Sequence, residues 1–138
     1  MFSVYPILRV CDGNGAPMFS IDLATPADAA ELAPFAEQTF RDTFAADNTA
    51  ANMDAYCAES FGVNRQRQEL EGDVFVTLLA RHDRVLAGYV QVCWDKHPDC
   101  LDPHLSPGEI RRIYVHRRFQ GHGYGRKLLE AGAEALVT

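Results

Sequence analysis

The chain has 138 residues, 47% of them hydrophobic, which is enough to bury one core but too few for two ordinary domains, so we expect a single domain. Its 13 Lys and Arg against 19 Asp and Glu give a formal net charge of −6, which argues against a general attraction to nucleic acid or to an anionic membrane. No apolar run reaches the roughly 20 residues that a membrane span needs, and the first residues lack the pattern of a secretory leader. The four cysteines are scattered without a CxxC pair, which favours reduced thiols in a cytoplasmic protein.

The first 17 residues are expected to lie outside the domain. Gly, Asn and Pro between positions 11 and 17 resist both helix and strand, so this stretch is predicted to be a turn or linker. We therefore predict an N-terminal extension or linker over residues 1–17, and a domain over residues 18–138. Met18 is itself a possible initiator, so the extension is either an added arm or a misassigned start.

A strand and three helical segments are predicted next. Residues 19–23 alternate as a short strand requires, and Thr25 and Pro26 supply an N-cap and a first helical residue. Apolar residues at helical spacing, from Leu32 to Phe40, then indicate a helix, in which Pro34 falls within the first turns. Two shorter helices are predicted over residues 49–60 and 64–70.

Residues 74–80 and 85–94 are rich in β-formers and are separated by a polar tetrad at 81–84, which predicts an antiparallel hairpin. Both strands are apolar on both faces, as is typical of central strands covered by helices. Gly88 within the second strand is costly unless a backbone or a ligand comes close to it.

A loop over residues 96–107, a strand over 110–115 and a helix from about residue 123 are predicted to follow. The helix has one face of small and apolar side chains, which allows close approach to a sheet. Its members are Tyr124, Leu128, Ala131, Gly132, Ala135 and Leu136.

The segment from Gln120 to Gly125 carries the strongest chemical signal in the sequence. A glycine-rich turn between a strand and a helix is suited to bind an anion, because the first helical N–H groups lack internal partners and glycine gives no Cβ obstruction. Arg126 and Lys127 oppose the helix dipole unless an anion lies beside them. A solvated glycine turn is the simpler alternative. Two other nucleotide-binding motifs fit less well. A P-loop ends in Gly-Lys-Ser/Thr, which this turn does not have, and a Rossmann fingerprint is followed by a second strand and an acidic residue, but the sequence ends first.

The run from Ile113 to Leu129 resembles the signature of the GNAT acetyltransferases, a strand followed by Gln/Arg-x-x-Gly-x-Gly/Ala. The resemblance extends over most of residues 19–137. Residues 39–44, 47–48, 52–53, 56 and 87–90 resemble the branch that includes bacterial spermidine/spermine N-acetyltransferases. The resemblance implies an α/β (α+β) fold whose mixed sheet has antiparallel N-terminal strands flanked by helices.

The same resemblance implies that acetyl-CoA is the co-substrate and that a small primary amine receives the acetyl group directly from the thioester. The signature strand would pair its backbone with the pantetheine arm, and the turn would wrap the pyrophosphate. The implied acyl-CoA contacts are Ile113, Tyr114, Val115, Gln120, Gly121, His122, Gly123, Tyr124, Gly125, Arg126 and Lys127.

Two residues are candidates for catalysis. The reaction needs a base for the ammonium proton, donors near the thioester oxygen and an acid for the thiolate. Glu109 matches a Glu that resembling proteins carry before the signature strand, and is the candidate base; a solvated strand-end carboxylate is the alternative. Tyr114 is the second candidate and is expected to face the side of the strand opposite to Ile113 and Val115. Packing in the core is the alternative to a catalytic role for its ring. By resemblance, Phe44, Asp47, Asn48 and Tyr56 border the acceptor groove.

A pattern of Cys93, His97, Cys100 and His104 contains residue types that bind zinc. Its spacing differs from that of a standard finger, and a buried free thiol is ordinary on a strand. We expect no metal.

Complete GNAT domains continue beyond the last helix with a strand beside the signature strand and a helix that often carries a tyrosine acid, so the resemblance implies a C-terminally truncated chain. The strand 110–115 would then be an open edge, which favours a homodimer or other homo-oligomer. Either two chains pair edge to edge, or residues 2–10 fold over the edge. Two functions remain open: a working N-acetyltransferase, and a catalytically silent CoA-binding or oligomerisation module.

Overall fold

The computed structural model describes residues 8–11, 17–72, 75–93 and 109–137. The strands are β1 (Leu8–Cys11), β2 (Pro17–Leu23), β3 (Phe75–His82), β4 (Val85–Cys93) and β5 (Glu109–Val115). The α-helices are α1 (Ala29–Phe44), α2 (Ala50–Ser60), α3 (Val63–Glu71) and α4 (Tyr124–Val137), and short 3-10 helices are η1 (Pro26–Asp28), η2 (Ala45–Asp47) and η3 (Arg117–Phe119). The chain forms two compact units, a helical unit over Thr25–Gly72 and a sheet unit that contains the rest.

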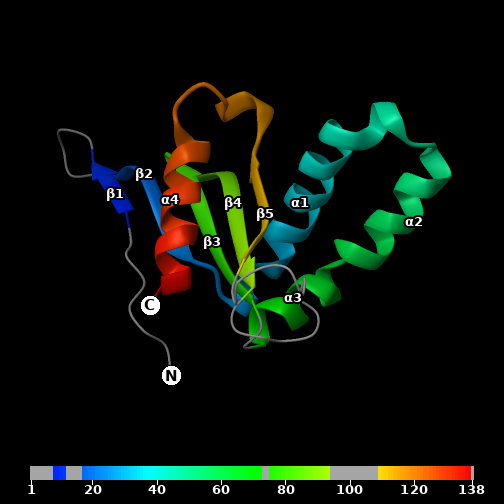
Figure 1. The fold of residues 1–138 in the computed structure, drawn as a ribbon, viewed down its shortest axis with the longest axis horizontal. Helices are drawn as coiled ribbons and strands as arrows, with labels where there is room; N and C mark the ends of the chain where they lie inside the picture. The colour runs from blue at the N-terminus through cyan, green and yellow to red at the C-terminus, as the bar shows by residue number, and fades with distance from the viewer. Residues whose placement is uncertain (1–7, 12–16, 73–74, 94–108, 138) are drawn as a thin grey trace. The chain divides into compact units, whose positions relative to one another are not determined.

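The sheet unit contains one antiparallel sheet with the order β1-β2-β3-β4-β5 (Figure 1). This arrangement confirms the predicted antiparallel strands and the inner position of the hairpin β3–β4. Strand β1 was not predicted, because residues 8–11 lie beside a stretch with turn composition. It pairs with β2, at the edge opposite to β5. The prediction that residues 2–10 fold over the 110–115 edge is therefore wrong for residues 8–10.

The turn of the β3–β4 hairpin is tighter than the predicted tetrad. His82 pairs with Val85, so only Asp83 and Arg84 form the loop. Both have positive φ, 49° and 72°, as a two-residue loop that matches the strand twist requires. Such loops usually use Asn or Gly, which explains why the sequence did not predict this one.

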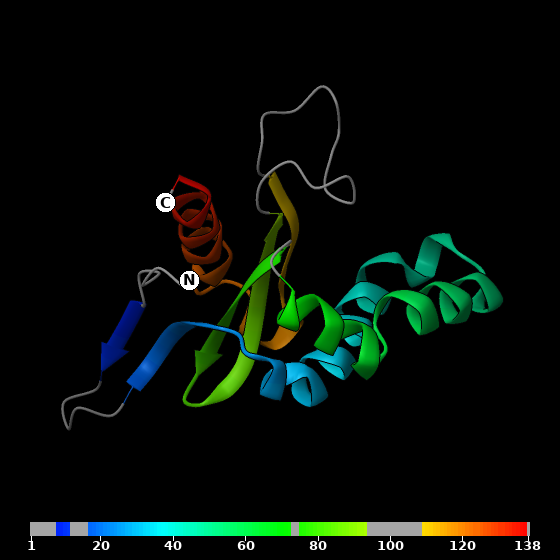
Figure 2. The ribbon, with the colours of Figure 1, turned by 90° about the horizontal axis from the view of Figure 1, so that it is seen from below.

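Helix α4 packs on one face of the sheet, over β3, β4 and β5 (Figures 1 and 2). Its buried residues Tyr124, Leu128 and Ala135 belong to the predicted apolar face and join the core. The sheet contributes to this core Phe19, Ile21, Leu78, Ala80, Ala87, Val90 and Val92. A Cβ on Gly132 would lie 3.0 Å from a methyl of Val90, so glycine lets the helix approach the sheet closely.

The helical unit begins with the predicted cap. The backbone N–H of Thr25 donates to Asp28 at 2.8 Å, and Pro26 opens η1, which continues into α1. Thr49 caps α2 by accepting a hydrogen bond from the backbone N–H of Asn52 at 3.1 Å. The three predicted helices are confirmed, with Pro34 inside α1.

Charge is divided unequally between the two units. The helical unit contains nine acidic and three basic residues, a net charge of −6, whereas the sheet unit contains ten of each. All five histidines also belong to the sheet unit. No helix in the described part of the chain is long and apolar enough to cross a membrane.

Candidate functional site

The connection from β5 to α4 is a tightly bonded turn. His116 caps η3 by accepting the backbone N–H of Arg118 at 3.1 Å, and the buried ring of Phe119 anchors the segment to the core. The Gln120 side-chain amide donates to the backbone oxygen of Val115 at 3.1 Å. These bonds reverse the chain within a few residues and bring the start of α4 next to the end of β5.

Two glycines shape the turn. Gly121 and Gly123 have φ of +89° and +78°, which L side chains rarely adopt, and a Cβ on either would meet nothing within 4 Å. They border a pocket of about 280 Å³ at the N-terminus of α4. Its lining residues are Val115, Phe119, Gln120, Gly121, Gly123, Tyr124 and Gly125. A concave, glycine-lined surface at a helix N-terminus fits a phosphate group, because unpaired N–H groups and the helix dipole both favour an anion.

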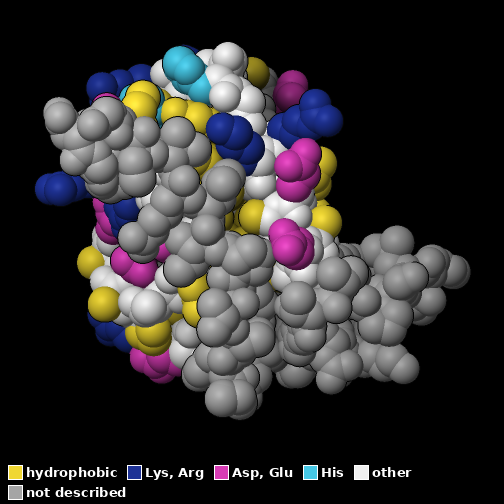
Figure 3. All heavy atoms as spheres, turned by 90° about the vertical axis from the view of Figure 1, so that its left-hand side faces the viewer, with side chains coloured by type: hydrophobic (Ala, Val, Ile, Leu, Met, Phe, Trp, Pro, Cys, Tyr) yellow, Lys and Arg dark blue, Asp and Glu magenta, His cyan; other side chains and the backbone are white. Residues whose placement is uncertain are grey.

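The two cations of the first helical turn contact other groups. Arg126 is exposed and pairs with Glu130 at 3.2 Å, one turn along the helix. The ammonium of Lys127 lies 4.8 Å from the ring centroid of Phe19. Neither residue lines the pocket, whose lining contains three glycines and no charged side chain. On the face shown in Figure 3, histidine side chains lie at the top beside basic side chains.

Strand β5 presents backbone groups on its outer side. The N–H of His116 donates to the oxygen of Ala87 at 2.8 Å, which marks Val115 as a residue that exchanges no ladder hydrogen bonds with its partner on β4. By the alternation of an antiparallel ladder, Ile113 is another. Both residues therefore direct N–H and C=O away from β4, next to the pocket that Val115 lines.

Tyr114 and Glu109 occupy different ends of β5. The ring of Tyr114 lies 5.7 Å from that of Tyr89, opposite it on β4, whereas Ile113 and Val115 pack against the core beneath α4. Tyr114 therefore faces away from that core, as predicted. Glu109 opens the strand opposite Cys93, and its side chain lies outside the described part of the structure.

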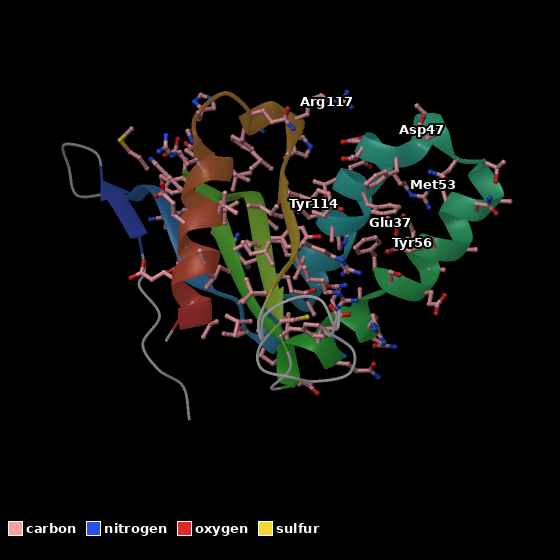
Figure 4. All side chains as sticks on the ribbon, in the orientation of Figure 1. Glu37, Asp47, Met53, Tyr56, Tyr114 and Arg117 are labelled. Carbon is pink, nitrogen blue, oxygen red and sulfur yellow. The ribbon has the colours of Figure 1, made fainter. Side chains whose placement is uncertain are left out.

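The four acceptor candidates all lie on the helical unit, and all are exposed. Figure 4 labels two of them, Asp47 and Tyr56. Phe44 and Tyr56 share a neighbour, because the ring of Phe40 lies 4.7 Å from the first and stacks at 4.6 Å on the second. Asn48 donates to the backbone oxygen of Phe44 at 2.9 Å and so closes the end of α1. Asp47 belongs to η2. The two aromatic candidates thus belong to one cluster around Phe40. The sequence had identified Phe40 only as one of the apolar residues at helical spacing.

Sequence reasoning did not identify His82 as a neighbour of the glycine turn. Its Nδ1 is hydrogen-bonded to the hydroxyl of Tyr124. His82 also lines a second pocket of about 300 Å³ together with Asp83, Val85, Arg118, Phe119 and His122. No sequence signal links positions 82 and 124, since only the pairing of β2, β3 and β4 beneath α4 brings them together.

The described residues contain no group of three or more His, Cys, Asp or Glu side chains that could hold a metal ion. Of the zinc pattern, His97, Cys100 and His104 lie outside the described residues. Cys93 is disulfide-bonded and Cys57 is a free, buried thiol, so the expectation of reduced cysteines is confirmed for Cys57 and wrong for Cys93.

Known proteins share this fold. The PaiA N-acetyltransferase of Thermoplasma acidophilum, crystallised with coenzyme A, superimposes with a TM-score of 0.71 at 15% identity, covering 86% of this chain and 72% of that one. A ribosomal-protein-alanine N-acetyltransferase of Brucella melitensis biovar Abortus 2308 gives a TM-score of 0.56 at 23% identity, covering 84% and 69%.

A curated relative matches in sequence. The "Uncharacterized N-acetyltransferase in pepI 3'region" of Lactobacillus delbrueckii subsp. lactis is 28% identical over 109 residues, which are 78% of this chain and 61% of the relative. The chain thus spans less than two thirds of that relative's length. Residues 34–138, well over half of the sequence, match the Acetyltransferase (GNAT) family, and the chain belongs to that family.

Proposed function

We propose that this chain binds acetyl-CoA and is the acyl-CoA-binding part of an N-acetyltransferase that acts on a small primary amine. The observation that carries the proposal is the pocket of about 280 Å³ at the start of α4, next to the outward-facing backbone of β5. One end of this surface suits a diphosphate and the other suits an amide-containing chain, which are the two parts of coenzyme A.

The diphosphate would be held by backbone N–H groups between Gly121 and Arg126, because the positive φ of Gly121 and Gly123 leaves this backbone open. The pantetheine arm would pair with the outward N–H and C=O groups of Ile113 and the N–H of Val115, as an added strand pairs with a sheet edge. His122, Arg126 and Lys127 would contribute charge at the rim. Gln120 would hold the end of β5 in place through Val115.

In the proposed reaction, the amine nitrogen attacks the thioester carbonyl, a C–N bond forms and the C–S bond breaks. Two protons leave the nitrogen of the ammonium group: one is taken by the base, and the loss of the other balances the proton that the departing sulfur receives. We assign Glu109 as the base, because it opens the strand that would hold the pantetheine, and Tyr114 as a hydroxyl group near the reacting atoms.

The acceptor is proposed to be a cationic amine of the polyamine kind. The helical unit has a net charge of −6, and its exposed aromatic rings suit a cation held over a π face. Phe44 and Tyr56 would provide these rings, and Asp47 and Asn48 would provide oxygen atoms for the ammonium group.

The alternative function is a catalytically silent CoA-binding or oligomerisation module. It is favoured by the position of β5, whose outer side pairs with no other strand of the described residues. Exposed edges tend to pair with another chain, so we propose that two copies associate through β5. A second copy on this edge would pair with the same backbone groups as pantetheine. The two occupants would therefore exclude one another, and competition between them can be tested.

Calorimetry with coenzyme A on Gly123→Ala and Gly123→Asn tests the binding site. Both variants add a Cβ where the diphosphate would lie, so both should bind at least tenfold more weakly. Asn tolerates positive φ better than Ala does, so thermal stability should fall in the alanine variant and recover in the asparagine variant. Gly72→Ala, at a glycine with φ of −84°, is the control. Unchanged affinity in both Gly123 variants would reject the site.

Turnover of acetyl-CoA with a panel of monoamines, diamines and polyamines tests the activity. Release of free thiol above background with any amine supports the enzyme. Binding of coenzyme A without turnover of any amine supports the silent module instead.

A further inference from the structure

Three polar side chains link the tip of the β3–β4 hairpin to the start of α4. The Nδ1 atom of His82 and the hydroxyl of Tyr124 are hydrogen-bonded to one another. A carboxylate oxygen of Asp83 lies 3.4 Å from Nε2 of the same imidazole. His82 and Tyr124 are 42 positions apart in the sequence, so this link is a tertiary contact within the sheet unit.

The neighbouring groups determine which atom donates in the hydrogen bond between His82 and Tyr124. Burial raises the pKa of Tyr124, and the negative charge of Asp83 raises it further, so the phenol keeps its hydrogen at neutral pH. The carboxylate beside Nε2 favours the histidine tautomer that carries its hydrogen there. Nδ1 is then the acceptor, and the hydroxyl of Tyr124 donates to it.

Tyr124 connects this link to the proposed diphosphate site. It is the first residue of α4, it lines the pocket of about 280 Å³, and its ring stacks on Phe19 at 4.2 Å. His82 and Asp83 line only the second pocket, whereas Phe119 lines both. The His82–Tyr124 hydrogen bond therefore joins a residue that lines the first pocket to one that lines the second.

A turn with two glycines at positive φ needs such a restraint. Glycine has more accessible backbone conformations than any other residue, so an unrestrained turn would lose conformational entropy when a ligand orders it. Phe119 fixes the first end of the turn in the core, and Tyr124 fixes the second. His82 is the only described side chain to which the Tyr124 hydroxyl is bonded.

We propose that His82 is a positioning residue for acyl-CoA, which holds Tyr124 and thereby keeps the Gly121–Gly123 turn in the conformation that receives the diphosphate. The inference rests on the proposed function. Asp83, whose carboxylate lies 3.4 Å from Nε2, favours the tautomer of His82 in which Nδ1 accepts. His82 does not line the first pocket, and its ring lies 5.3 Å from that of Phe119 and 6.1 Å from that of His122, but its hydrogen bond to a residue of that pocket is the one to Tyr124.

A double-mutant cycle tests the link. Coenzyme A affinity is measured by calorimetry for wild type, His82→Leu, Tyr124→Phe and the double variant. Each single variant breaks the same bond, so each should weaken binding roughly fivefold and the double variant should be no weaker than either single. His82→Gln should recover most of the affinity, because its amide oxygen can accept the Tyr124 hydrogen. Arg84→Gln, in the same turn, is the control and should bind as wild type does.

Pantetheine, which lacks the diphosphate, separates positioning from general damage. Its affinity, measured by competition, should be unchanged in His82→Leu, and thermal melting should show both proteins folded. Equal losses for coenzyme A and pantetheine, or unchanged coenzyme A affinity in both single variants, would overturn the inference alone. Absence of coenzyme A binding by the wild-type protein would overturn the proposed function, and the inference with it.

Discussion

Gly88 lies where β4 passes both β5 and α4. A Cβ at this position would lie 2.6 Å from the backbone oxygen of Tyr114 and 3.1 Å from Cδ1 of Leu128. A backbone atom within a paired strand cannot move away cheaply, so of the two explanations that the sequence offered for Gly88, a close backbone or a close ligand, the structure shows the close backbone. The glycine costs β propensity and is retained because no larger residue fits.

We therefore expect Gly88→Ala to lower the free energy of unfolding by about 1–3 kcal/mol, as overpacking of a core does. Urea denaturation monitored by circular dichroism measures this change. Gly72→Ala serves as the control, because a Cβ there would lie an ordinary 3.4 Å from the nearest atom and φ is −84°. If the Gly88→Ala protein is as stable as the Gly72→Ala protein, the sheet can adjust to a Cβ at position 88 and the expectation is wrong.

Strand β5 shows where a period-two pattern misleads. The register shifts between Gln91 and Val92, which face Arg112 and Ile110, so Arg111 is inserted between these two residue pairs as a bulge. The shift brings Ile110 to the same side as Ile113 and Val115, and all three pack against the core. Simple alternation would have placed Ile110 on the other face. A bulge of this kind depends on the partner strand, which is why the sequence did not reveal it.

The start of α2 is an element whose stability depends on one side chain. The Thr49 hydroxyl oxygen accepts the Asn52 N–H, one of the groups that no helical carbonyl can satisfy. Thr49→Ala should lower the free energy of unfolding by about 1 kcal/mol, and Thr49→Ser should largely preserve it. Chemical denaturation of the three proteins provides the comparison. Equal losses in both variants would mean that the methyl group, rather than the cap, stabilises the helix.

Alkaline pH should lower the free energy of unfolding of the protein through ionisation of Cys57. Burial raises the pKa of its thiol above the ordinary 9.0, against a smaller lowering by Arg41. The folded state therefore holds the proton more tightly than the unfolded state, and stability falls as pH rises above about 9. Below this pH both states hold the proton and the effect vanishes. Tyr124, whose pKa burial also raises, adds to the loss at still higher pH.

Urea midpoints measured between about pH 8 and about pH 10.5 test this expectation. Cys57→Ala should be less stable than wild type at pH 8, since it removes a buried side chain, but its midpoint should fall less steeply with pH. Parallel pH profiles for the two proteins would contradict the assignment to Cys57.

The predictable part of the molecule consists of features encoded by neighbouring residues. The Thr25 cap, the β3–β4 hairpin, the glycine turn and the apolar face of α4 each follow from residues close together in the sequence, and each is present. The remaining features are set by contacts between distant segments. The bond between His82 and Tyr124 arises only when α4 packs on the sheet, and the aromatic cluster of Phe40 depends on the packing of α1 with α2. Strand β1 pairs with the next strand along the chain and was missed because of the turn composition beside it.

The division of charge between the units has a kinetic consequence. The helical unit has a net charge of −6 and the sheet unit has none, so an approaching ligand meets an anionic molecule even where its binding surface is neutral. A phosphorylated ligand is slowed and a cationic one is accelerated at low salt, and screening reduces both effects as ionic strength rises. The association rates of the two proposed substrates would thus change in opposite directions with salt. The order in which the substrates bind would then depend on ionic strength as well as on the pocket.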